Sequence, residues 1–507
     1  MNPLIQLKNV TPLFLAVFVG VCLVLSPRAQ AVSPPPDGGY AGGNTAEGQN
    51  ALLSRTTGGF NTALGWLSLR ALTTGSYNTG VGAGTLVLNT GDQNTAVGTA
   101  ALLLNTAGTN NTAVGAVALL NNTATGNTAI GSNALLNNTT GGTLGNIQGL
   151  DVGPNVAVGW QALESNTVAS ANTAVGYQAL HSFITGPMGF EQLGLCTAVG
   201  FQALANATGG LGNDAFGYRA LYNNTDGSGN TAIGLVALSS NTTGNSNTAT
   251  GDSALRNNTS GSYNTANGAG ALVNNATGGA NVAIGAQALN SNTAGFQNTA
   301  VGDAALANSI SGNANIALGI LAGSGVTTAE NVICIGADGA NVSDTCYIGN
   351  IFGETSASGV AVYVNSSHKL GTLTSSNRFK DDIKPMEHVS EALFGLKPVI
   401  FRYKKDIDPA GMQQFGLVAE DVEKVNPALV VRDKEGKPYS VRYDQVNAML
   451  LNEFLKEHRK VEQQRKDFEA ALAQQQKQID VLTAGLQKVS AQLELSKSAP
   501  QTVLNNQ

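Results

Sequence analysis

A unit built on Asn-Thr-Ala-Val-Gly, with a period of about seventeen residues, recurs almost without interruption from Asn44 to Gly319. Position five of the unit is glycine in all sixteen copies, and position nine is leucine in fifteen of them. The copies begin at Asn44, Asn61, Asn78, Asn94, Asn111, Asn127, Asn155, Asn172, Cys196, Asn213, Asn230, Asn247, Asn264, Asn281, Asn298 and Asn315. Self-similarity at a fixed period indicates that each unit is one supersecondary element stacked on its neighbours. We therefore expect a rod with extended surfaces. For such a rod, a structural or binding role is more expected than an enzymatic role that needs an enclosed pocket.

The composition of one unit predicts a coil with a single short strand. Thr-Ala-Val is typical of a strand, and the following glycine ends it where the backbone needs a conformation that other residues rarely adopt. The leucine at position nine would fill a narrow interior, and the asparagines at position one would form a hydrogen-bonded ladder along the stack. Sixteen coils at ~4.8 Å each predict a rod of roughly 75–80 Å. Helical repeats do not fit because glycine, asparagine and threonine lie inside every candidate helix, and collagen does not fit because glycine does not recur every third residue.

The Asn-Thr-Ala-Val/Ile-Gly core resembles the Asn-x-Val-Ala-Ile-Gly repeats in the heads of trimeric autotransporter adhesins. Those heads form left-handed parallel β-rolls. The resemblance implies β-roll geometry and threefold assembly, and it suggests adhesion to a surface glycan or another cell-envelope ligand.

Two copies are interrupted by extra residues. One insertion runs from Thr143 to Pro154, and the other includes Pro187 to Leu195. Insertions in solenoids map to loops on one face and often carry binding. Two interpretations stay open: binding loops, or surface loops that have no partner.

Charge is distributed unevenly along the chain. The formal net charge is −6, no lysine occurs between Lys8 and Lys369, and the last third is rich in lysine, arginine, glutamate and aspartate. This change in composition near residue 370 predicts a boundary between two kinds of structure. A lysine-free rod has no basic patch for nucleic acid, so we expect no DNA or RNA partner.

The N-terminal segment 1–31 is typical of an export signal. Lys8 precedes an apolar run from Thr11 to Leu25, and Ala29-Gln30-Ala31 provides a cleavage site. The alternative is a retained membrane anchor. We expect removal of residues 1–31, a linker at 32–43, and a secreted or surface-displayed protein with no further membrane span.

The rod lacks the groupings that catalysis or metal binding requires. Glycan-cleaving enzymes need two carboxylates about 5–9.5 Å apart, which adjacent coils would supply if acids matched in consecutive copies. Asp252 and Asp303 share position six but lie three coils apart. The other acids are scattered and are expected to be solvated single charges, at Asp92, Asp151, Glu164, Glu191, Asp214 and Asp226. His181 is the only histidine of the rod and has no cysteine or histidine cluster near it, so we expect neither a metal nor a cofactor.

The mature chain carries three cysteines, at 196, 334 and 346. Three cysteines do not make a disulfide framework. The sequence Cys334-Ile335-Gly336 aligns with Cys346-Tyr347-Ile348-Gly349. In this alignment Cys334 and Cys346 occupy adjacent strand positions, whose side chains point to opposite faces. A bridge between them is therefore not favoured, although the sequence leaves it open.

After residues 354–373, which we expect to connect as strands, the sequence resembles the peptidase S74 family. This family provides the intramolecular chaperone at the end of phage endosialidases and tail spikes. The similarity covers residues 374–472. Its motifs are Ser375-Ser376-Asn377-Arg378-Phe379-Lys380-Asp381-Asp382-Ile383-Lys384-Pro385, Ala392-Leu393-Phe394-Gly395-Leu396-Lys397-Pro398-Val399-Ile400-Phe401-Arg402-Tyr403 and Phe415-Gly416-Leu417-Val418-Ala419-Glu420-Asp421-Val422.

The resemblance implies a homotrimer whose last domain guides folding of the β-rich shaft and then cuts itself off with a Ser–Lys dyad. The nucleophile of the family falls on Ser375 and its general base on Lys380. A lysine accepts a proton only in its neutral form, so burial in the trimer or a neighbouring cation would have to favour the free amine. Many members carry aspartate directly after the serine, whereas this chain has Ser376, which is an alternative nucleophile.

Residues 447–496 have the spacing of a coiled coil. Apolar and a few polar residues alternate at intervals of three and four, which is the pattern of the a and d positions. These positions, which we call the seam, are Leu451, Phe454, His458, Val461, Arg465, Phe468, Leu472, Gln475, Ile479, Leu482, Leu486, Val489 and Leu493. The alternative is one amphipathic helix packed on its own domain.

These patterns predict a mainly β protein: a β-solenoid or β-roll shaft at 44–353, a small α+β chaperone domain, and a C-terminal trimeric coiled coil. The expected function is assembly of an exported, tail-fibre-like surface structure with one self-cleavage event per chain. A non-cleaving structural or adhesive fibre with the same assembly domain is the alternative.

Overall fold

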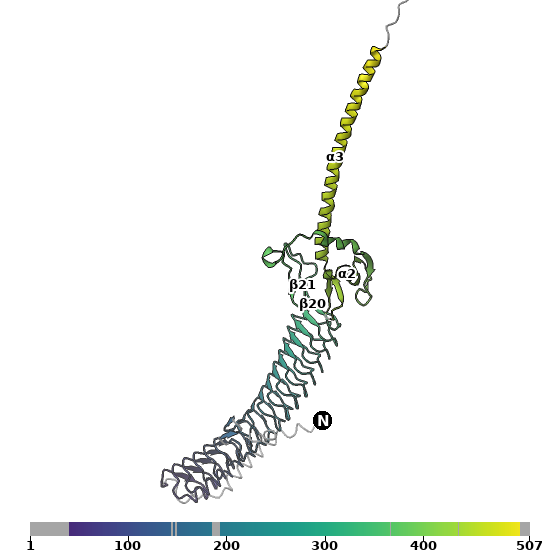
Figure 1. Ribbon diagram of the computed structural model, residues 1–507. Helices are drawn as coiled ribbons and strands as arrows, with labels where there is room; N and C mark the ends of the chain where they lie inside the picture. Colours follow the sequence, from purple (N-terminus) through teal and green to yellow (C-terminus); the bar gives the residue numbers. More distant parts are fainter. Residues whose placement is uncertain are drawn as a thin grey trace, which may run out of the picture. The chain divides into compact units, whose positions relative to one another are not determined.

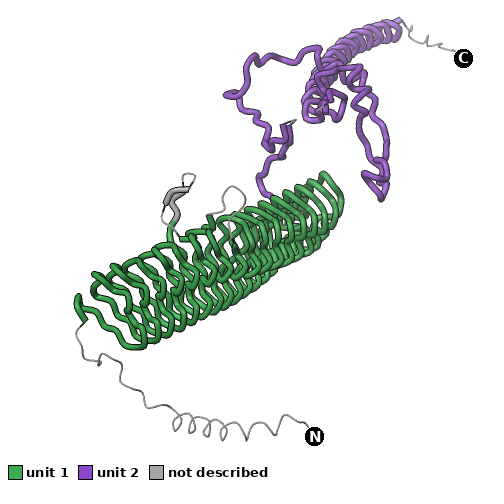
Figure 2. Tube along the Cα trace, turned by 90° about the horizontal axis from the view of Figure 1, so that it is seen from below, with its two compact units in different colours: residues 1–354 green, residues 355–507 purple. Residues whose placement is uncertain are grey.

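The computed structural model describes residues 40–142, 145–147, 150–184, 193–365, 367–433 and 435–496. The expected export signal at 1–31, residues 32–39 of the linker and most of the second insertion lie outside these ranges. The chain divides into two compact units, Met1–Glu354 (unit 1) and Thr355–Gln507 (unit 2). Each is described by itself, and Figure 2 shows them in separate colours.

Unit 1 is a parallel β-solenoid, which confirms the predicted fold class (Figure 1). Each coil contributes one three-residue strand to a single sheet of eighteen strands. The strands are β1 (Thr45–Glu47), β2 (Thr62–Leu64), β3 (Thr79–Val81), β4 (Thr95–Val97), β5 (Thr112–Val114), β6 (Thr128–Ile130), β9 (Val156–Val158), β10 (Thr173–Val175), β11 (Thr197–Val199), β12 (Asp214–Phe216), β13 (Thr231–Ile233), β14 (Thr248–Thr250), β15 (Thr265–Asn267), β16 (Val282–Ile284), β17 (Thr299–Val301), β18 (Ile316–Leu318), β19 (Ile333–Ile335) and β20 (Cys346–Ile348). The stack therefore continues for two coils beyond the sixteen copies that the repeat defines.

The strands pair in register with the next copy of the repeat. In β13 and β14, for example, Thr231 lies opposite Thr248 and Ala232 opposite Ala249. In every strand of this sheet except β20 the central residue points inward and is buried, as Ala232 and Ala249 are. The flanking residues point outward, because successive side chains of a strand alternate between faces. In most coils the alanine at position eight is buried as well, and these two small residues leave room for the leucine that follows.

The leucines at position nine form the core column that the repeat predicts. All fifteen are buried, from Leu52 to Leu306. Their backbone is left-handed, with φ between 49° and 53°. This conformation costs an L-residue roughly 1–2 kcal/mol, whereas full burial of a leucine contributes about 1.5–3 kcal/mol, so the two effects offset each other. The repeat did not indicate this strained backbone.

The glycine at position five is required for both conformation and space, as Gly234 illustrates. Its φ is +139°, and a Cβ atom there would lie 2.4 Å from the carbonyl oxygen of Gly251 in the next coil. Every other residue type would therefore push adjacent coils apart. This agrees with the prediction that glycine ends each strand.

The asparagines at position one form the predicted ladder. The side-chain amide nitrogen of Asn247 donates to Asn230 Oδ1 at 3.1 Å and to the Gly261 carbonyl at 2.9 Å. Asn247 Oδ1 in turn accepts from the backbone and side-chain nitrogens of Asn264, at 3.0 and 3.1 Å. Each asparagine thus connects its coil to both neighbours in a fully buried position.

A second ladder of buried asparagines occupies position twelve, and the sequence analysis did not predict it. Asn258 Nδ2 donates to Asn241 Oδ1 at 2.8 Å and to the Gly261 carbonyl at 2.9 Å. Its ten members are Asn89, Asn105, Asn122, Asn138, Asn166, Asn224, Asn241, Asn258, Asn275 and Asn292. The asparagine that opens the sequence Asn241-Thr242-Thr243-Gly244 therefore supplies internal hydrogen bonds, to Asn224 Oδ1 and to the Gly244 carbonyl.

The position-one ladder is interrupted in the coil that begins at Cys196, and the position-twelve ladder is interrupted in that coil and in the one before it. Cys196 replaces the asparagine at position one, and Phe183 and Ala207 replace it at position twelve. All three side chains are buried. Burial raises the pKa of the Cys196 thiol to about 11, so this thiol stays protonated near neutral pH. On the preceding coil, Asn166 Oδ1 has lost the donor that the next asparagine would provide and, within the described part of the chain, has no hydrogen-bond partner.

The first insertion leaves the stack intact. Strand β6 pairs directly with β9, so that Thr128 lies opposite Val156 although the whole insertion comes between them in the chain. Within the insertion lies an antiparallel pair, β7 (Gly145–Ile147) and β8 (Leu150–Val152). Across the second insertion, β10 likewise pairs with β11.

Unit 2 is a small α+β unit with three two-stranded antiparallel sheets, β21–β22, β23–β24 and β25–β26, in the part of it that the structure describes. Its elements are β21 (Tyr363–Val364), β22 (Leu370–Gly371), η2 (Asn377–Phe379), η3 (Glu387–Gly395), β23 (Val399–Arg402), β24 (Gln413–Gly416), α2 (Ala419–Val425), η4 (Pro427–Leu429), β25 (Val430–Arg432), β26 (Pro438–Val441) and α3 (Tyr443–Leu495). The core is small: the fully enclosed apolar side chains belong to Val422, Leu429, Val430, Val441 and Met449. Among the described helices, none has the length and hydropathy required to cross a membrane.

Candidate functional site

The residues of the predicted dyad lie around one short helical turn, η2. Ser375 and Ser376 precede this turn and Lys380 follows it. The turn is closed by backbone bonds from Phe379 N–H to the Ser376 carbonyl at 3.1 Å and from Lys380 N–H to the Asn377 carbonyl at 3.0 Å. A spacing of five positions across such a turn keeps both functional groups in one local segment.

The single chain does not bring the dyad together. Ser375, Ser376 and Lys380 are all exposed. No hydrogen bond joins either serine hydroxyl to the amine of Lys380 among the residues that the structure describes. The neighbouring cation Arg378 lies over the ring of Phe379, 4.7 Å from its centroid. The dehydrated environment that a neutral lysine needs is therefore not provided by one copy of unit 2.

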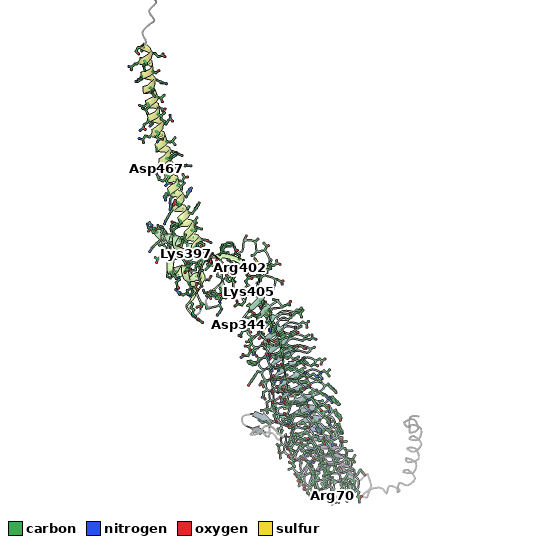
Figure 3. The ribbon with its side chains drawn as sticks, turned by 90° about the vertical axis from the view of Figure 1, so that its right-hand side faces the viewer. Arg70, Asp344, Lys397, Arg402, Lys405 and Asp467 are labelled. Atoms are coloured by element: carbon green, nitrogen blue, oxygen red, sulfur yellow. The ribbon has the colours of Figure 1, made fainter. Side chains whose placement is uncertain are left out.

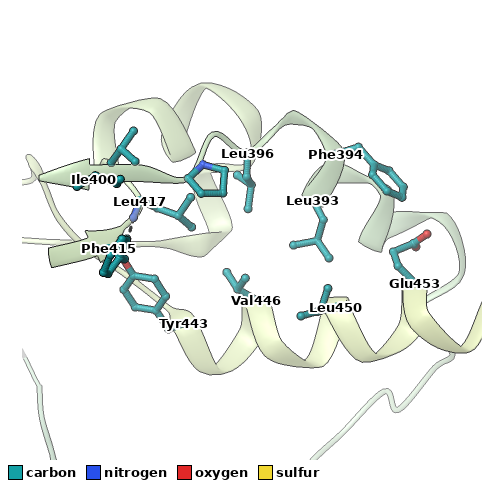
Figure 4. A pocket seen from close by; sticks show the side chains of 13 residues that line it. Leu393, Phe394, Leu396, Ile400, Phe415, Leu417, Tyr443, Val446, Leu450 and Glu453 are labelled. Atoms are coloured by element: carbon teal, nitrogen blue, oxygen red, sulfur yellow. Dashed lines mark hydrogen bonds between the residues drawn. The ribbon is translucent and has the colours of Figure 1, made fainter.

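An open apolar pocket of about 580 Å³ lies beside the first turns of α3 (Figure 4). Side chains from η3, β23, β24 and α3 point into it from facing sides, as the labelled Leu393, Phe415 and Leu450 show. At one end the Tyr443 hydroxyl accepts a hydrogen bond from the Leu417 backbone N–H at 3.1 Å. Phe394 and Phe415 on its rim are 77% and 74% exposed, so large aromatic surfaces of this pocket are uncovered in the single chain.

A polar cluster fastens η3 to α3 next to the pocket. The hydroxyl of the buried Ser390 donates to Glu453, and Lys456 contacts the same carboxylate at 2.8 Å. Asn452 Nδ2 donates to Ser390 Oγ at 2.7 Å. The hydrogen bond from Lys456, with a second one from Ser390, lowers the pKa of Glu453. Because each of these groups is bonded to another member of the cluster, we assign the cluster a structural role.

The seam of α3 is uncovered along the helix. All ten apolar members are exposed, from Leu451 to Leu493, with Leu486 at 71%. In Figure 3, the part of α3 around Asp467 projects its side chains with no other element of unit 2 packed against it. The helix confirms the predicted secondary structure. A coiled coil requires further chains, so it remains a prediction.

In unit 1 the structure corrects the expectation for Glu164. His181 Nε2 lies 3.0 Å from Glu164 Oε2, and Asn133 Nδ2 donates to Glu164 Oε1 at 3.1 Å. Glu164 is therefore not a solvated single acid, since its side chain is only 15% exposed and is paired on both sides. Glu164 and His181 occupy position ten of consecutive copies, and that shared position was the sequence feature that could have predicted the pair. The described residues contain no group of three or more metal-ligating side chains.

The cysteines follow the expectation from their strand positions. Cys334 lies opposite Tyr347, and Cys346 lies opposite Ile333. The first is buried, the second is exposed, and both are free thiols. Burial raises the pKa of Cys334.

A comparison with known families finds a match within unit 2. Residues 375–431 match the Peptidase S74 family model, which is described as the chaperone of endosialidase. This confirms the resemblance over those residues, and the match begins at Ser375 itself. No curated protein and no solved structure matches the chain. The similarity of the repeats to adhesin heads therefore stays a prediction.

Proposed function

We propose that the chain forms an exported, tail-fibre-like homotrimer whose S74 region guides assembly and then separates itself by cleavage near residue 375. One observation carries this proposal: a Peptidase S74 match begins at Ser375, directly after the connection that follows a β-solenoid shaft. The shaft would be the durable product. The region after it would act once, during assembly.

The uncovered seam of α3 supports association of several copies. Helices with apolar residues at alternating intervals of three and four bury them against each other in coiled coils. Exposed apolar rows of this length are unusual on a monomer, and they mark interaction surfaces. The polar seam residues His458, Arg465 and Gln475 would fix register and the number of strands.

The small core of unit 2 supports the same conclusion. Among the residues of unit 2 that the structure describes, only five apolar side chains are enclosed in its core. Small units of this kind rarely gain enough from a single core and usually need an additional source of stability, of which oligomerisation is one. Neighbouring copies would also cover the rim of the apolar pocket at Phe394 and Phe415.

Assembly of the trimer would then make Lys380 able to act as the general base. In one chain the Lys380 amine is exposed, whereas a lysine that acts as a base needs an environment from which water is removed. Contact with neighbouring copies would remove water from this segment and favour the neutral amine. Cleavage would thus occur only after the trimer has formed.

The reaction is an acyl transfer followed by hydrolysis, and in each step Lys380 carries the proton from the attacking oxygen to the leaving group. Neutral Lys380 removes the proton of the Ser375 hydroxyl as the oxygen adds to a nearby backbone carbonyl. The resulting ammonium protonates the leaving amide nitrogen, so the peptide bond breaks and an ester to Ser375 forms. Lys380 then deprotonates a water molecule, which hydrolyses the ester and restores the serine.

A denaturing gel of the purified full-length protein tests this proposal. We expect a C-terminal fragment that begins near residue 375 and extends to Gln507. N-terminal sequencing of the fragment locates the broken bond. The Ser375→Ala and Lys380→Ala variants should remain intact, because each lacks one half of the dyad.

The matched controls separate this chemistry from a general loss of structure. Lys384→Ala removes a nearby exposed lysine and should leave cleavage unchanged. Ser376→Ala decides between the two serines, since loss of cleavage in this variant alone would move the nucleophile to Ser376. If assembled wild-type trimers stay as full-length chains, the self-cleavage proposal fails and the molecule is a non-cleaving fibre.

Export is part of the same proposal and has its own test. The basic start, the apolar run and the Ala29-Gln30-Ala31 site support removal of residues 1–31. N-terminal sequencing of the large fragment should therefore begin at Val32. A start at Met1 would contradict export by this route.

A further inference from the structure

Four consecutive coils carry a column of stacked aromatic rings at position six. The rings are those of Trp160, Tyr177, Phe201 and Tyr218. Their centroids are 5.0, 4.9 and 5.3 Å apart in that order, with interplanar angles of 21°, 6° and 8°. Each ring is 41–43% exposed. The column therefore presents a continuous row of ring edges to solvent.

A row of hydrogen-bonded polar side chains runs beside the aromatic column at position seven. Gln178 Nε2 donates to Gln161 Oε1 at 2.8 Å, and Gln202 Nε2 donates to Gln178 Oε1 at 2.9 Å. The Arg219 guanidinium continues the row by donating to Gln202 Oε1 at 2.9 Å. An amide group has two N–H donors and two acceptor lone pairs, so this row uses only part of its hydrogen-bonding capacity.

Position ten borders the same face. Arg219 lies over both Tyr218 at position six and Tyr222 at position ten, 5.4 and 5.0 Å from the ring centroids. The paired Glu164 and His181 also occupy position ten, in the first two of these coils. We call the side chains at positions six, seven and ten of the four coils the aromatic–amide face.

This combination is restricted to these coils. The copy before them has Ser132 and Asn133 at positions six and seven, and the copy after them has Leu235 and Val236. No other two consecutive copies have aromatic residues at position six. The repeat folds without such a column elsewhere, so stacking of the coils does not require it.

The internal hydrogen-bond pattern of the shaft is disrupted at the same place. Among the sixteen copies, only the one that begins at Cys196 lacks asparagine at both position one and position twelve, and the copy before it has Phe183 at position twelve. Asn166 Oδ1 is left without a partner within the described chain, as is Asn292 Oδ1, which precedes Ser309 at the next position twelve. The second insertion lies between these two coils, and the first precedes the coil that begins at Asn155. Departures from otherwise consistent local rules are expected at functional sites. This observation is independent of the aromatic column and points to the same part of the shaft.

From these observations we propose that the aromatic–amide face binds a neutral, extended oligosaccharide that lies along the stack of coils. The proposal rests on the proposed function, because it gives the exported fibre a ligand. Sugars combine apolar C–H groups with many hydroxyls, and this face offers aromatic rings beside unused amide donors and acceptors. Its repetition from coil to coil suits a ligand that also repeats.

The charges and the backbone favour this ligand over two others. The face has one full cation, Arg219, and one carboxylate, Glu164, which His181 already pairs, so it does not suit a highly charged polymer such as nucleic acid. A peptide that adds as a strand needs an unpaired backbone edge. Here the backbone is used between coils, as in the bonds from Gln178 N–H to the Trp160 carbonyl and from Gln202 N–H to the Tyr177 carbonyl.

Trp160 provides the readout, because the chain contains only two tryptophans. In the full assembled protein with Trp66→Phe, we would titrate neutral oligosaccharides of about four to eight glucose, mannose or galactose units and record tryptophan emission. We expect a saturable change with at least one of these probes. In addition, Tyr177→Ala with Phe201→Ala should weaken binding by about tenfold or more, since the ligand loses the centre of the column.

The control removes a similar pair of rings from another part of the coil. Phe60 and Tyr77 stack at position seventeen with centroids 5.2 Å apart. Phe60→Ala with Tyr77→Ala should bind as the parent protein does. Circular dichroism melting of both double variants establishes that they are folded, and Gln178→Ala with Gln202→Ala tests the amide row with smaller changes to the surface.

Four results would overturn the proposal. The first two are no binding of any neutral probe and an unchanged affinity in the Tyr177 and Phe201 double variant. The other two are binding of polysialic acid or single-stranded DNA alone, and a Trp160 whose emission iodide cannot quench in the assembled protein. Repeating the titration in the Ser375→Ala background separates the two proposals. Binding should be the same there, because the face belongs to unit 1, so a failure of self-cleavage and a failure of sugar binding are distinguished.

Discussion

Asn247 illustrates, at the scale of one residue, how the shaft satisfies polar groups in its interior. Its amide takes part in four hydrogen bonds, two as donor and two as acceptor, with the two neighbouring coils and with the turn of its own coil. A buried polar group that loses its partner costs about 1–3 kcal/mol. A side chain that makes several buried hydrogen bonds therefore contributes more to the free energy of unfolding than its size suggests.

We predict that Asn247→Ala destabilises the shaft by about 2–4 kcal/mol, because the Gly261 carbonyl and the Asn264 backbone N–H lose their side-chain partner. Amide hydrogen exchange of residues 247–264 measures the effect locally. Asn257→Ala is the matched control, since the side chain of Asn257 is exposed and its amide donates to Asn274 Oδ1. Equal exchange rates in the two variants would contradict a stabilising ladder.

Residue by residue, the repeat allowed prediction of features that depend only on period. The position-one ladder, the leucine column and the glycine requirement all followed from which residues recur. The left-handed backbone of the leucines did not, because leucine normally avoids that conformation and only the closure of the coil imposes it. The pairing of Glu164 with His181 was missed because each acid was judged alone, without comparing its position with the next copy.

At the scale of elements, α3 is the helix that its spacing predicts, but its partners come from outside the chain. Its first turns pack on η3 and carry Met449 of the core. The remainder exposes the seam. The exposed dyad has the same origin: sequence motifs indicated Ser375 and Lys380, whereas the contacts that would bring them together belong to the assembly.

We predict that Leu482→Ser weakens assembly of the full-length protein, because a polar group would enter the apolar seam. Sedimentation velocity measures the assembled mass, and the variant should dissociate at a higher protein concentration than the parent. Val481→Ser is the matched control, since Val481 is 72% exposed but lies outside the seam, next to Leu482 at 66%. If both substitutions had the same effect, the seam would not be the interface.

At the scale of the whole molecule, the coil is the unit of construction. Every strand of the large sheet pairs with the next copy of the repeat, even where an insertion intervenes. Stability in such arrays is approximately a sum of coil and interface contributions, so coils are exchangeable in number.

We predict that removal of residues 247–297, three whole copies, leaves a folded protein whose shaft is shorter by about 14 Å. The two new neighbours would again place asparagine on asparagine and glycine on glycine. Electron microscopy of the particles measures the length, and circular dichroism melting measures stability. Removal of residues 247–255 is the contrasting change, because it leaves half a coil and displaces the leucines from the interior. An equally stable product from this second deletion would contradict the coil as the building unit.

The absence of lysine from the shaft affects how well the molecule resists digestive proteases. Trypsin-like proteases cleave after lysine or arginine and require an extended segment, yet residues 44–353 contain only four such positions, Arg55, Arg70, Arg219 and Arg256. Each lies on a coil whose backbone is hydrogen-bonded to other parts of the stack, as in the bond from Arg219 N–H to the Phe201 carbonyl. Digestion should therefore trim the lysine-rich C-terminal unit first and spare the rod, so the part that remains longest in such an environment is the one that carries the aromatic–amide face.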